Sequence, residues 1–261
     1  MVMAFLVAAL VACGSSAPDT PVELEVAPPQ SMPDLPFPPT DQLSLSERTP
    51  VTGGSAAYFP EPHAGQGRSY LRWLVRGEVF SGKQVLVESN VSAEPGAVSV
   101  VLYQEHGGGP RASLHVNYGE DHGRWVAKSF RSGEAGELVE LGIPEVHIPT
   151  DPARFHSERM RKTVDIEALG VERVTVPAGT FEAIRVRRTW ANNGSKTTVE
   201  DTWWAGVGAV ARVVTSEGAT AMVTTADVLY EVGPADTDEA RRALFEAGNE
   251  ALRAGPAEPP G

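Results

Sequence analysis

Apolar and polar residues alternate over most of the chain, and short glycine-containing segments interrupt the alternation. This period-two pattern is typical of strands that bury one face, and turns this short join neighbouring antiparallel strands. We therefore predict a mainly β domain over residues 58–233, folded as a curved antiparallel sheet or half-barrel of about ten strands. The candidate strands span residues 70–79, 85–91, 98–104, 112–118, 125–130, 138–142, 163–168, 172–176, 180–190, 197–204, 209–215 and 220–230.

The pair Asn193-Gly194 marks the clearest hairpin. Both residues accept a positive φ, which favours a two-residue type I′ turn between the strands. A two-residue turn places Asn192 opposite Ser195, and Trp190 then shares the apolar face of the hairpin with Trp203. We expect this face to be buried and the opposite face to be wet.

Two segments have the start signals of helices. Asp151-Pro152 supplies a cap and a first-turn proline, which predicts a short helix over residues 152–161. A C-terminal segment, residues 234–254, predicts a second, amphipathic helix over residues 237–253 with Asp236 as its N-cap. One apolar stripe on the second helix is expected to dock on the sheet. The stripe consists of Leu244, Phe245, Gly248, Ala251 and Leu252.

The first 13 residues carry a targeting signal. Residues 2–12 are all apolar, a run long enough for the core of a signal peptide and too short to span a bilayer. The run ends in Leu10-Val11-Ala12-Cys13, which resembles the lipobox of bacterial lipoproteins. The resemblance implies cleavage before Cys13, a diacylglycerol on its thiol and an acyl chain such as palmitate on its amino group. A buried structural thiol is the alternative role for this cysteine.

Residues 14–57 are rich in proline and lack apolar periodicity. Such a segment favours an extended, disordered chain, so we predict a tether that holds the domain away from a membrane. We predict a second disordered tail over residues 255–261. The predicted location is the bacterial cell envelope, with the lipid on Cys13 as the contact to the membrane. We favour the periplasmic side of the outer membrane, because Gly14 follows the cysteine in place of the aspartate that often retains lipoproteins in the inner membrane.

The formal net charge of −12 restricts the partners. An acidic chain without a basic stripe releases no counterions from nucleic acid, so we predict no nucleic-acid partner. The same charge repels anionic lipid head groups. Attachment to a membrane therefore depends on the lipid anchor.

Motifs for catalysis and metal binding are weak. Residues 106–109 read His-Gly-Gly-Gly, as in some esterase oxyanion loops, but no G-x-S-x-G nucleophile segment accompanies them. His115 and His122 fall on opposite faces of a predicted hairpin and cannot share an ion in that register. Because no nucleophile, base and orienting group come together, we predict no catalytic residues, no cofactor and no metal site.

Two motifs carry a resemblance to a family. Residues 174–181 read Val-Thr-Val-Pro-Ala-Gly-Thr-Phe, and residues 203–208 read Trp-Trp-Ala-Gly-Val-Gly. Together they resemble uncharacterised bacterial envelope lipoproteins, whose curved sheets are similar to the half-barrels of periplasmic lipoprotein carriers. The resemblance implies a lipid or apolar ligand on the concave face. For the motif residues themselves we expect a structural role, and the alternative is a ligand mouth with Trp190, Trp203 and Trp204 as candidate ligand-face aromatics. The alternative is a non-catalytic structural module that binds another envelope protein.

Overall fold

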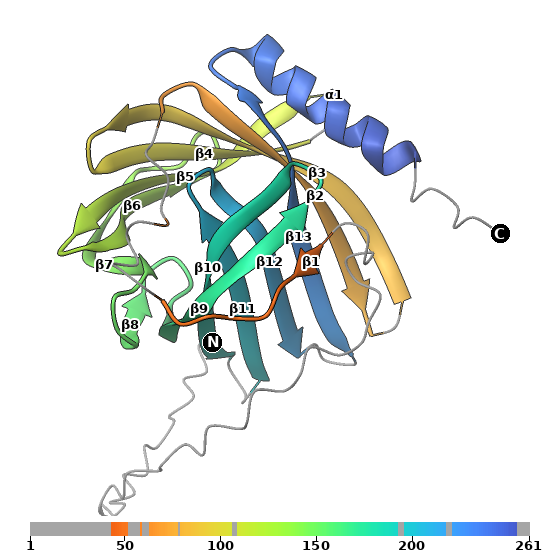
Figure 1. Ribbon diagram of the computed structural model, residues 1–261. Helices are drawn as coiled ribbons and strands as arrows, with labels where there is room; N and C mark the ends of the chain where they lie inside the picture. The colour runs from red at the N-terminus through yellow and green to blue at the C-terminus, as the bar shows by residue number, and fades with distance from the viewer. Residues whose placement is uncertain are drawn as a thin grey trace, which may run out of the picture. The chain divides into compact units, whose positions relative to one another are not determined.

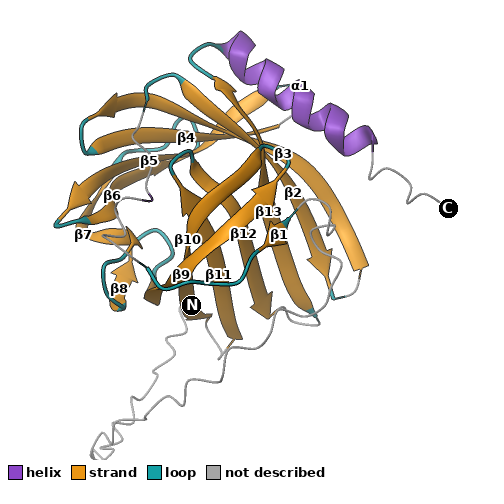
Figure 2. Cartoon of the chain, in the orientation of Figure 1, coloured by secondary structure: helices purple, strands orange, loops and turns teal. Residues whose placement is uncertain are grey.

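The computed structural model describes residues 43–51, 58, 63–77, 79–105, 109–192, 196–217 and 221–254. This part of the chain forms one open antiparallel sheet of 13 strands and one C-terminal helix (Figure 1). Figure 2 shows that most of the described chain consists of strands. The predicted fold class, a mainly β curved antiparallel sheet with a C-terminal helix, is confirmed. Cys13, the lipobox residues Leu10, Val11 and Ala12, and the tail 255–261 lie outside the described residues.

Two runs of consecutive strands build the sheet. The strands are β1 (Ser44–Leu45), β2 (Gln66–Arg76), β3 (Val79–Glu94), β4 (Ala97–Glu105), β5 (Pro110–Asp121), β6 (Arg124–Ser132), β7 (Val139–Ile148), β8 (Ala153–Ser157), β9 (Lys162–Val176), β10 (Gly179–Asn192), β11 (Lys196–Ala205), β12 (Gly208–Glu217) and β13 (Met222–Pro234), and the helix is α1 (Asp238–Ala254). Their order is β1-β9-β10-β11-β12-β13-β2-β3-β4-β5-β6-β7, with β8 paired to β9 beside this path. β13 and β2 therefore lie side by side in the middle of the sheet (Figure 1).

Strand β9 joins two segments that the alternation predicts as separate strands. A register shift beside Arg185 of β10 leaves Leu169 without a paired residue in β10. Next to it, Gly170 has φ +144°, and a Cβ at this position would lie 2.6 Å from the carbonyl oxygen of Thr49. Glycine is needed here because the segment 43–51 passes directly against β9.

The folded domain begins earlier than the predicted boundary at Tyr58. Ser44 pairs with Thr175 in β9, and Thr49 N–H donates to the carbonyl oxygen of Val171 at 2.8 Å. Residues 43–51, which the proline content assigns to the tether, thus add to the edge of the sheet. Backbone pairing with an open strand edge outweighs the local preference of this segment for extended, solvated chain.

The segment 152–161 is not helical, contrary to the prediction. Ala153–Ser157 forms β8, and a turn follows at residues 158–161. Phe155 is buried, whereas Arg154 and His156 beside it are exposed. This alternation has the period of a strand, and pairing with β9 outweighs the helix-start signal of the preceding residues.

The hairpin of β10 and β11 has a different register from the predicted one. Asn192 pairs with Lys196, so 3 residues separate the paired positions instead of the expected two. A shift by one residue moves every side chain of β11 to the other face of the sheet. Trp190 therefore shares its face with Trp204, and Trp203 lies on the opposite face. Because Trp203 is completely buried there, its packing outweighs the preference of the turn.

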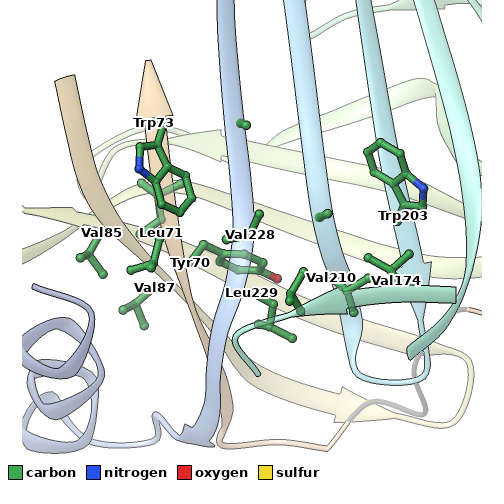
Figure 3. Close-up of a cluster of buried hydrophobic side chains, with 14 of the residues drawn as sticks. Tyr70, Leu71, Trp73, Val85, Val87, Val174, Trp203, Val210, Val228 and Leu229 are labelled. Carbon is green, nitrogen blue, oxygen red and sulfur yellow. The ribbon is translucent and has the colours of Figure 1, made fainter. Parts of the chain in front are cut away.

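The sheet has two different faces, which we name the helix face and the inner face. On the helix face, α1 packs over β2, β3 and β13, and apolar side chains fill the space beneath it. Figure 3 shows Trp73 and Trp203 at the two ends of this core, with Val228 between them. On the inner face, side chains of β4, β6 and β7 meet those of β8, β9 and β10 in a second core. The two ends of the sheet therefore approach each other on the inner face.

α1 confirms the predicted C-terminal helix. Its cap is Thr237, one residue later than predicted, and the Thr237 Oγ1 accepts the Ala240 N–H at 3.1 Å. At Gly248 the helix is so close to the sheet that a Cβ would lie 2.8 Å from the Val85 Cγ1. The buried side of the helix consists of Leu244, Phe245, Gly248 and Leu252. No helix in the described chain combines the length and the apolar composition that crossing a bilayer requires.

Candidate functional site

The structure separates the tryptophans that the sequence groups as ligand-face aromatics. Trp203 lies in the core of the helix face, and its Nε1–H donates to Glu172 Oε2 at 2.5 Å. It is therefore a core residue. Trp190 and Trp204 lie on the inner face beside the second core. The Trp204 ring meets the His147 ring edge-on, at a centroid distance of 6.3 Å.

Trp203 and several charged side chains lie on the same side of the sheet, and together we name them the helix-face network. It consists of Arg48, Glu172, Arg185, Arg187, Asp201 and Trp203. Arg48 donates to Glu172 at 2.8 Å, and both Arg185 and Arg187 donate to Asp201 at 2.5 to 2.8 Å. Short hydrogen bonds thus satisfy both carboxylates, and we assign this network a structural role.

A second set of charged side chains lies on the inner face, and we name it the inner cluster. It consists of Glu145, His147, Arg159, Arg188, Glu200 and Arg212. β7 supplies Glu145 and His147, the turn after β8 supplies Arg159, and β10, β11 and β12 supply one residue each. Strands from opposite ends of the sheet therefore build the cluster together.

The ion pairs of the inner cluster are long. Arg188 Nη2 lies 3.7 Å from Glu145 Oε2, and Arg188 Nη1 lies 3.8 Å from Glu200 Oε1. Arg159 Nη2 lies 3.8 Å from Glu145 Oε2. All three separations exceed hydrogen-bonding distance, so the attraction is Coulombic alone. Glu145 is held instead by Ser157, whose hydroxyl donates to Glu145 Oε1 at 2.6 Å.

Several buried polar atoms of the inner cluster have no hydrogen-bond partner among the described residues. They are Arg188 Nε and Nη2, Arg212 Nε and His147 Nε2. Burying guanidinium donors without acceptors is unfavourable, and native proteins pair nearly all such groups. The inner cluster therefore presents donors to an acceptor that lies outside the described chain, either water or a ligand oxygen.

Burial and the three arginines together set the protonation of the inner cluster. Burial, together with the three arginines of the cluster, holds the pKa of His147 well below its usual value of 6.5, so His147 is neutral at neutral pH. Burial also opposes the ionisation of Glu200, but the same arginines outweigh it and lower the pKa of that carboxyl. The Tyr118 ring lies 4.9 Å from the His147 ring, and burial raises the pKa of Tyr118 to about 12.

Water reaches some residues of the inner cluster and not others. The side chains of Arg188 and Glu145 are 4% and 1% exposed. The side chain of Arg159 is 26% exposed, and that of Arg212 is 41% exposed. Arg188 and Glu145 thus form a dry part of the cluster, and water reaches the cluster at Arg212 of β12 and at Arg159 beside Glu145.

Sequence reasoning missed the inner cluster, although two of its residues carry a signal. Arg188 stands between Val186 and Trp190 in the apolar register of β10, and Arg212 occupies the same kind of position in β12. A charge at an apolar position of a buried strand marks a functional or strained site. Glu145 carries no such signal, because it lies beyond the predicted strand 138–142.

Among the described residues, no three His, Cys, Asp or Glu side chains gather as metal ligands would. The groups that the inner cluster offers to a ligand are hydrogen-bond donors and charges. Comparison with protein families, with curated proteins and with solved structures finds no match for this chain.

Proposed function

We propose that this protein is a membrane-anchored lipoprotein of the bacterial cell envelope that binds a lipid-like, amphiphilic ligand on the inner face of its sheet. One observation carries the binding proposal: a water-accessible strip of mixed apolar and charged side chains in the middle of the inner face. The anchoring proposal rests on residues 1–13 and on their resemblance to a lipobox.

The position of β12 supports access from the inner face. β12 lies between β11 and β13, so its side chains reach water only through a face of the sheet. On the helix face, Ala211 and Val213 are buried. On the inner face, the neighbouring Arg212 and Val214 remain partly exposed. Water therefore reaches the middle of a broad sheet from the inner side.

A row of paired residues crosses the inner face and combines apolar with charged groups. Its members, each paired with the next, are Leu74, Thr225, Val214, Glu200 and Arg188. With strands about 4.8 Å apart, the row is about 19 Å long. Leu74 and Val214 are partly exposed, whereas Arg188 is dry. Small-molecule sites combine apolar contact area with a few placed polar groups in this way.

Binding is tested on the full chain carrying Cys13→Ser, purified without detergent. We expect native mass spectrometry to show a co-purified mass on the order of several hundred daltons that is lost on denaturation. We also expect the neutral apolar probe N-phenylnaphthylamine to gain fluorescence on binding in a saturable manner. A clean apo mass together with no saturable probe binding overturns the binding proposal.

A matched pair of variants locates the site. Leu74→Glu introduces a charge into the row and should weaken probe binding at least about tenfold. Ile143→Glu places the same charge on β7, where the residue is 63% exposed, and should leave binding unchanged. Equal effects of the two substitutions would place the probe elsewhere.

Anchoring is tested in cells of a bacterial host. The unmodified chain should sediment with membranes and incorporate labelled palmitate, because two or more acyl chains anchor a protein stably. Cys13→Ser should move it to the soluble fraction. Unmodified protein in the soluble fraction without label contradicts the anchor.

A second candidate function is the binding of another envelope protein along the edge strand β7. β7 is the last strand of the sheet path, and Val139 and Ile143 are 43% and 63% exposed on it. Exposed apolar groups on an open strand edge favour pairing with a partner segment. Site-specific photocrosslinking from position 143 in cells should then capture one defined protein, and the absence of any crosslink argues against this function.

A further inference from the structure

We infer that the inner cluster is the subsite for an oxyanion, a carboxylate or phosphate group, which Arg188 holds through its Nε and Nη2 donors. This inference rests on the proposed function and gives the bound amphiphile a chemical class: one negatively charged head group on an apolar chain. Nothing in the sequence motifs of this chain points to such a group.

The first support is the edge of Arg188 that remains unpaired. Nε–H and Nη2–H lie on the same edge of a guanidinium and match the two oxygens of a carboxylate. The chain itself uses this edge in three other places, where an arginine donates from Nε and Nη2 to both oxygens of one aspartate. These pairs are Arg72 with Asp227, Arg154 with Asp165, and Arg187 with Asp201. In Arg188, the equivalent edge is buried and has no acceptor among the described residues.

The second support is that no neighbouring carboxylate can fill this role without moving. Glu145 accepts hydrogen bonds at its Oε1 from the Ser157 hydroxyl at 2.6 Å and from the Arg159 N–H at 3.3 Å. These bonds hold its other oxygen 3.7 Å from Arg188 Nη2. The chain thus fixes its own acceptor just out of reach of the arginine and leaves the edge available.

The third support is the balance of charge. In the inner cluster, the three guanidinium groups of Arg159, Arg188 and Arg212 face the two carboxylates of Glu145 and Glu200, which leaves one positive charge. The adjacent charges on the inner face balance one another: Arg72 binds Asp227, which also lies 3.9 Å from Arg212 Nε, and Arg68 binds Glu88. One monoanion therefore neutralises the site, and buried charges require such pairing.

The fourth support is the direction in which the row runs. Arg188 is its dry end, and the partly exposed Val214 and Leu74 follow at increasing distance. An oxyanion on Arg188 places the attached chain over these apolar side chains. Arg212 Nε and His147 Nε2, likewise without a hydrogen-bond partner among the described residues, are further polar groups of the inner cluster.

The test compares dodecanoate with dodecanol, which has the same chain and no charge, by calorimetric titration of the Cys13→Ser chain. We expect dodecanoate to bind at least tenfold more tightly than dodecanol. Arg188→Met should abolish this preference and retain dodecanol binding, because it keeps the length and apolar stem of the side chain. Arg188→Lys should restore only part of the preference, since an ammonium lacks the two-donor edge. Arg154→Met removes an exposed arginine with the same edge and should change nothing.

Further ligands in the same titration distinguish a failure of the oxyanion subsite from a failure of the proposed function. Dodecyl phosphate that binds like dodecanoate widens the class to both oxyanions and supports the inference. Acetate or inorganic phosphate that binds as tightly as dodecanoate supports an oxyanion subsite but identifies a small free anion, which contradicts the lipid-like ligand. Equal binding of dodecanoate and dodecanol overturns the oxyanion subsite, leaves the proposed function intact and assigns water to the Arg188 edge. Failure of every amphiphile overturns both proposals. Circular dichroism of Arg188→Met at the titration temperature shows whether the variant is folded.

Discussion

Arg185 and Arg188 stand three residues apart on β10, and they lie in two opposite kinds of environment. Arg185 belongs to the helix-face network, where it donates to Asp201 at 2.5 Å and contacts the ring of Trp203. Arg188 belongs to the inner cluster, where its nearest carboxylates lie 3.7 and 3.8 Å away. Both side chains are almost entirely buried.

The difference between the two arginines concerns their donors. Arg185 has one unpartnered donor, Nε, and places its other nitrogens on Asp201 and Glu172. Arg188 leaves Nε and Nη2 unpartnered together. Burial alone therefore does not distinguish a structural charge from a binding group. The distinguishing property is whether the chain supplies the matching acceptors at hydrogen-bonding distance.

Replacement of each arginine by methionine should separate the two roles most strongly. Arg185→Met removes one donor from each of two buried carboxylates, Asp201 and Glu172, which should lower the free energy of unfolding by about 2–3 kcal/mol. Arg187 still binds Asp201, and Arg48 and Trp203 still bind Glu172. Arg188→Met removes a charge whose donors are unmatched, so the loss should stay below about 1 kcal/mol. Urea unfolding of both variants in the absence of ligand measures the difference.

A double variant serves as the control for this comparison. Because Arg185 and Arg188 lie on opposite faces, their effects should add to within about 0.5 kcal/mol. An equal, large loss of stability from Arg188→Met would show that its long ion pairs are structural, and it would remove the distinction between the two sites.

Acid should weaken the inner cluster at a higher pH than the helix-face network. Burial and three arginines lower the pKa of His147, so below about pH 6.5 the unfolded chain binds a proton that the folded chain does not. Stability therefore falls as pH decreases below this value, by up to about 1.4 kcal/mol per pH unit. Burial opposes ionisation of Asp201, but Arg187 and Arg185 outweigh it and lower its pKa, so its contribution is lost only below about pH 4.

Urea unfolding at pH 7 and pH 5.5 measures the slope, and His147→Gln should flatten it. His115→Gln is the matched control. Burial and Arg131 also lower the pKa of His115, but its ring is only partly buried, so this substitution should flatten the slope less than His147→Gln does. A slope that His147→Gln leaves unchanged would show that the inner cluster does not exclude a proton from this ring.

The smallest expected effect concerns the hydroxyl that fixes Glu145. Ser157→Ala removes two hydrogen bonds, the one donated to Glu145 and the one accepted from the Met160 N–H at 3.1 Å, and should cost about 1 kcal/mol of stability. It also frees Glu145 to rotate toward Arg188 and to occupy its open edge, which should weaken dodecanoate binding several-fold. The control is Ser99→Ala, which removes a hydrogen bond of 2.6 Å to Asn117 outside the inner cluster. Dodecanoate titration and urea unfolding are compared between the two variants. Unchanged dodecanoate binding would show that Glu145 does not control the edge.

Alternation along the chain predicted the sheet well because a strand that buries one face must repeat every two residues. It failed where tertiary contacts decide. The short helix predicted from Asp151-Pro152 is strand β8, because pairing with β9 and burial of Phe155 outweigh a local cap. The hairpin register shifted by one residue, because the packing of Trp203 outweighs the turn preference. Local propensity is a weak signal beside such contacts.

The candidate site was less predictable than the fold for a physical reason. The sequence grouped Trp190, Trp203 and Trp204 by residue type, whereas the register assigns Trp203 to the other face. Arg188 could have been singled out as a charge in an apolar register, but its partner Glu145 comes from the distant strand β7. Which charges remain unmatched depends on distances of a few tenths of an ångström, and residue patterns carry no such information.

The pairing of β2 with β13 has a consequence for how the chain acquires its structure. Pairs such as Leu71 with Val228 join the first long strand to the last one at the centre of the sheet. The chain loses the conformational entropy of closing this long loop before the contact can stabilise it. Folds dominated by distant pairings therefore form slowly. The two runs of consecutive hairpins can assemble separately, but their union waits until the final strand has emerged. Until then both runs present an open edge, and this interval is the stage at which the chain is most exposed to aggregation.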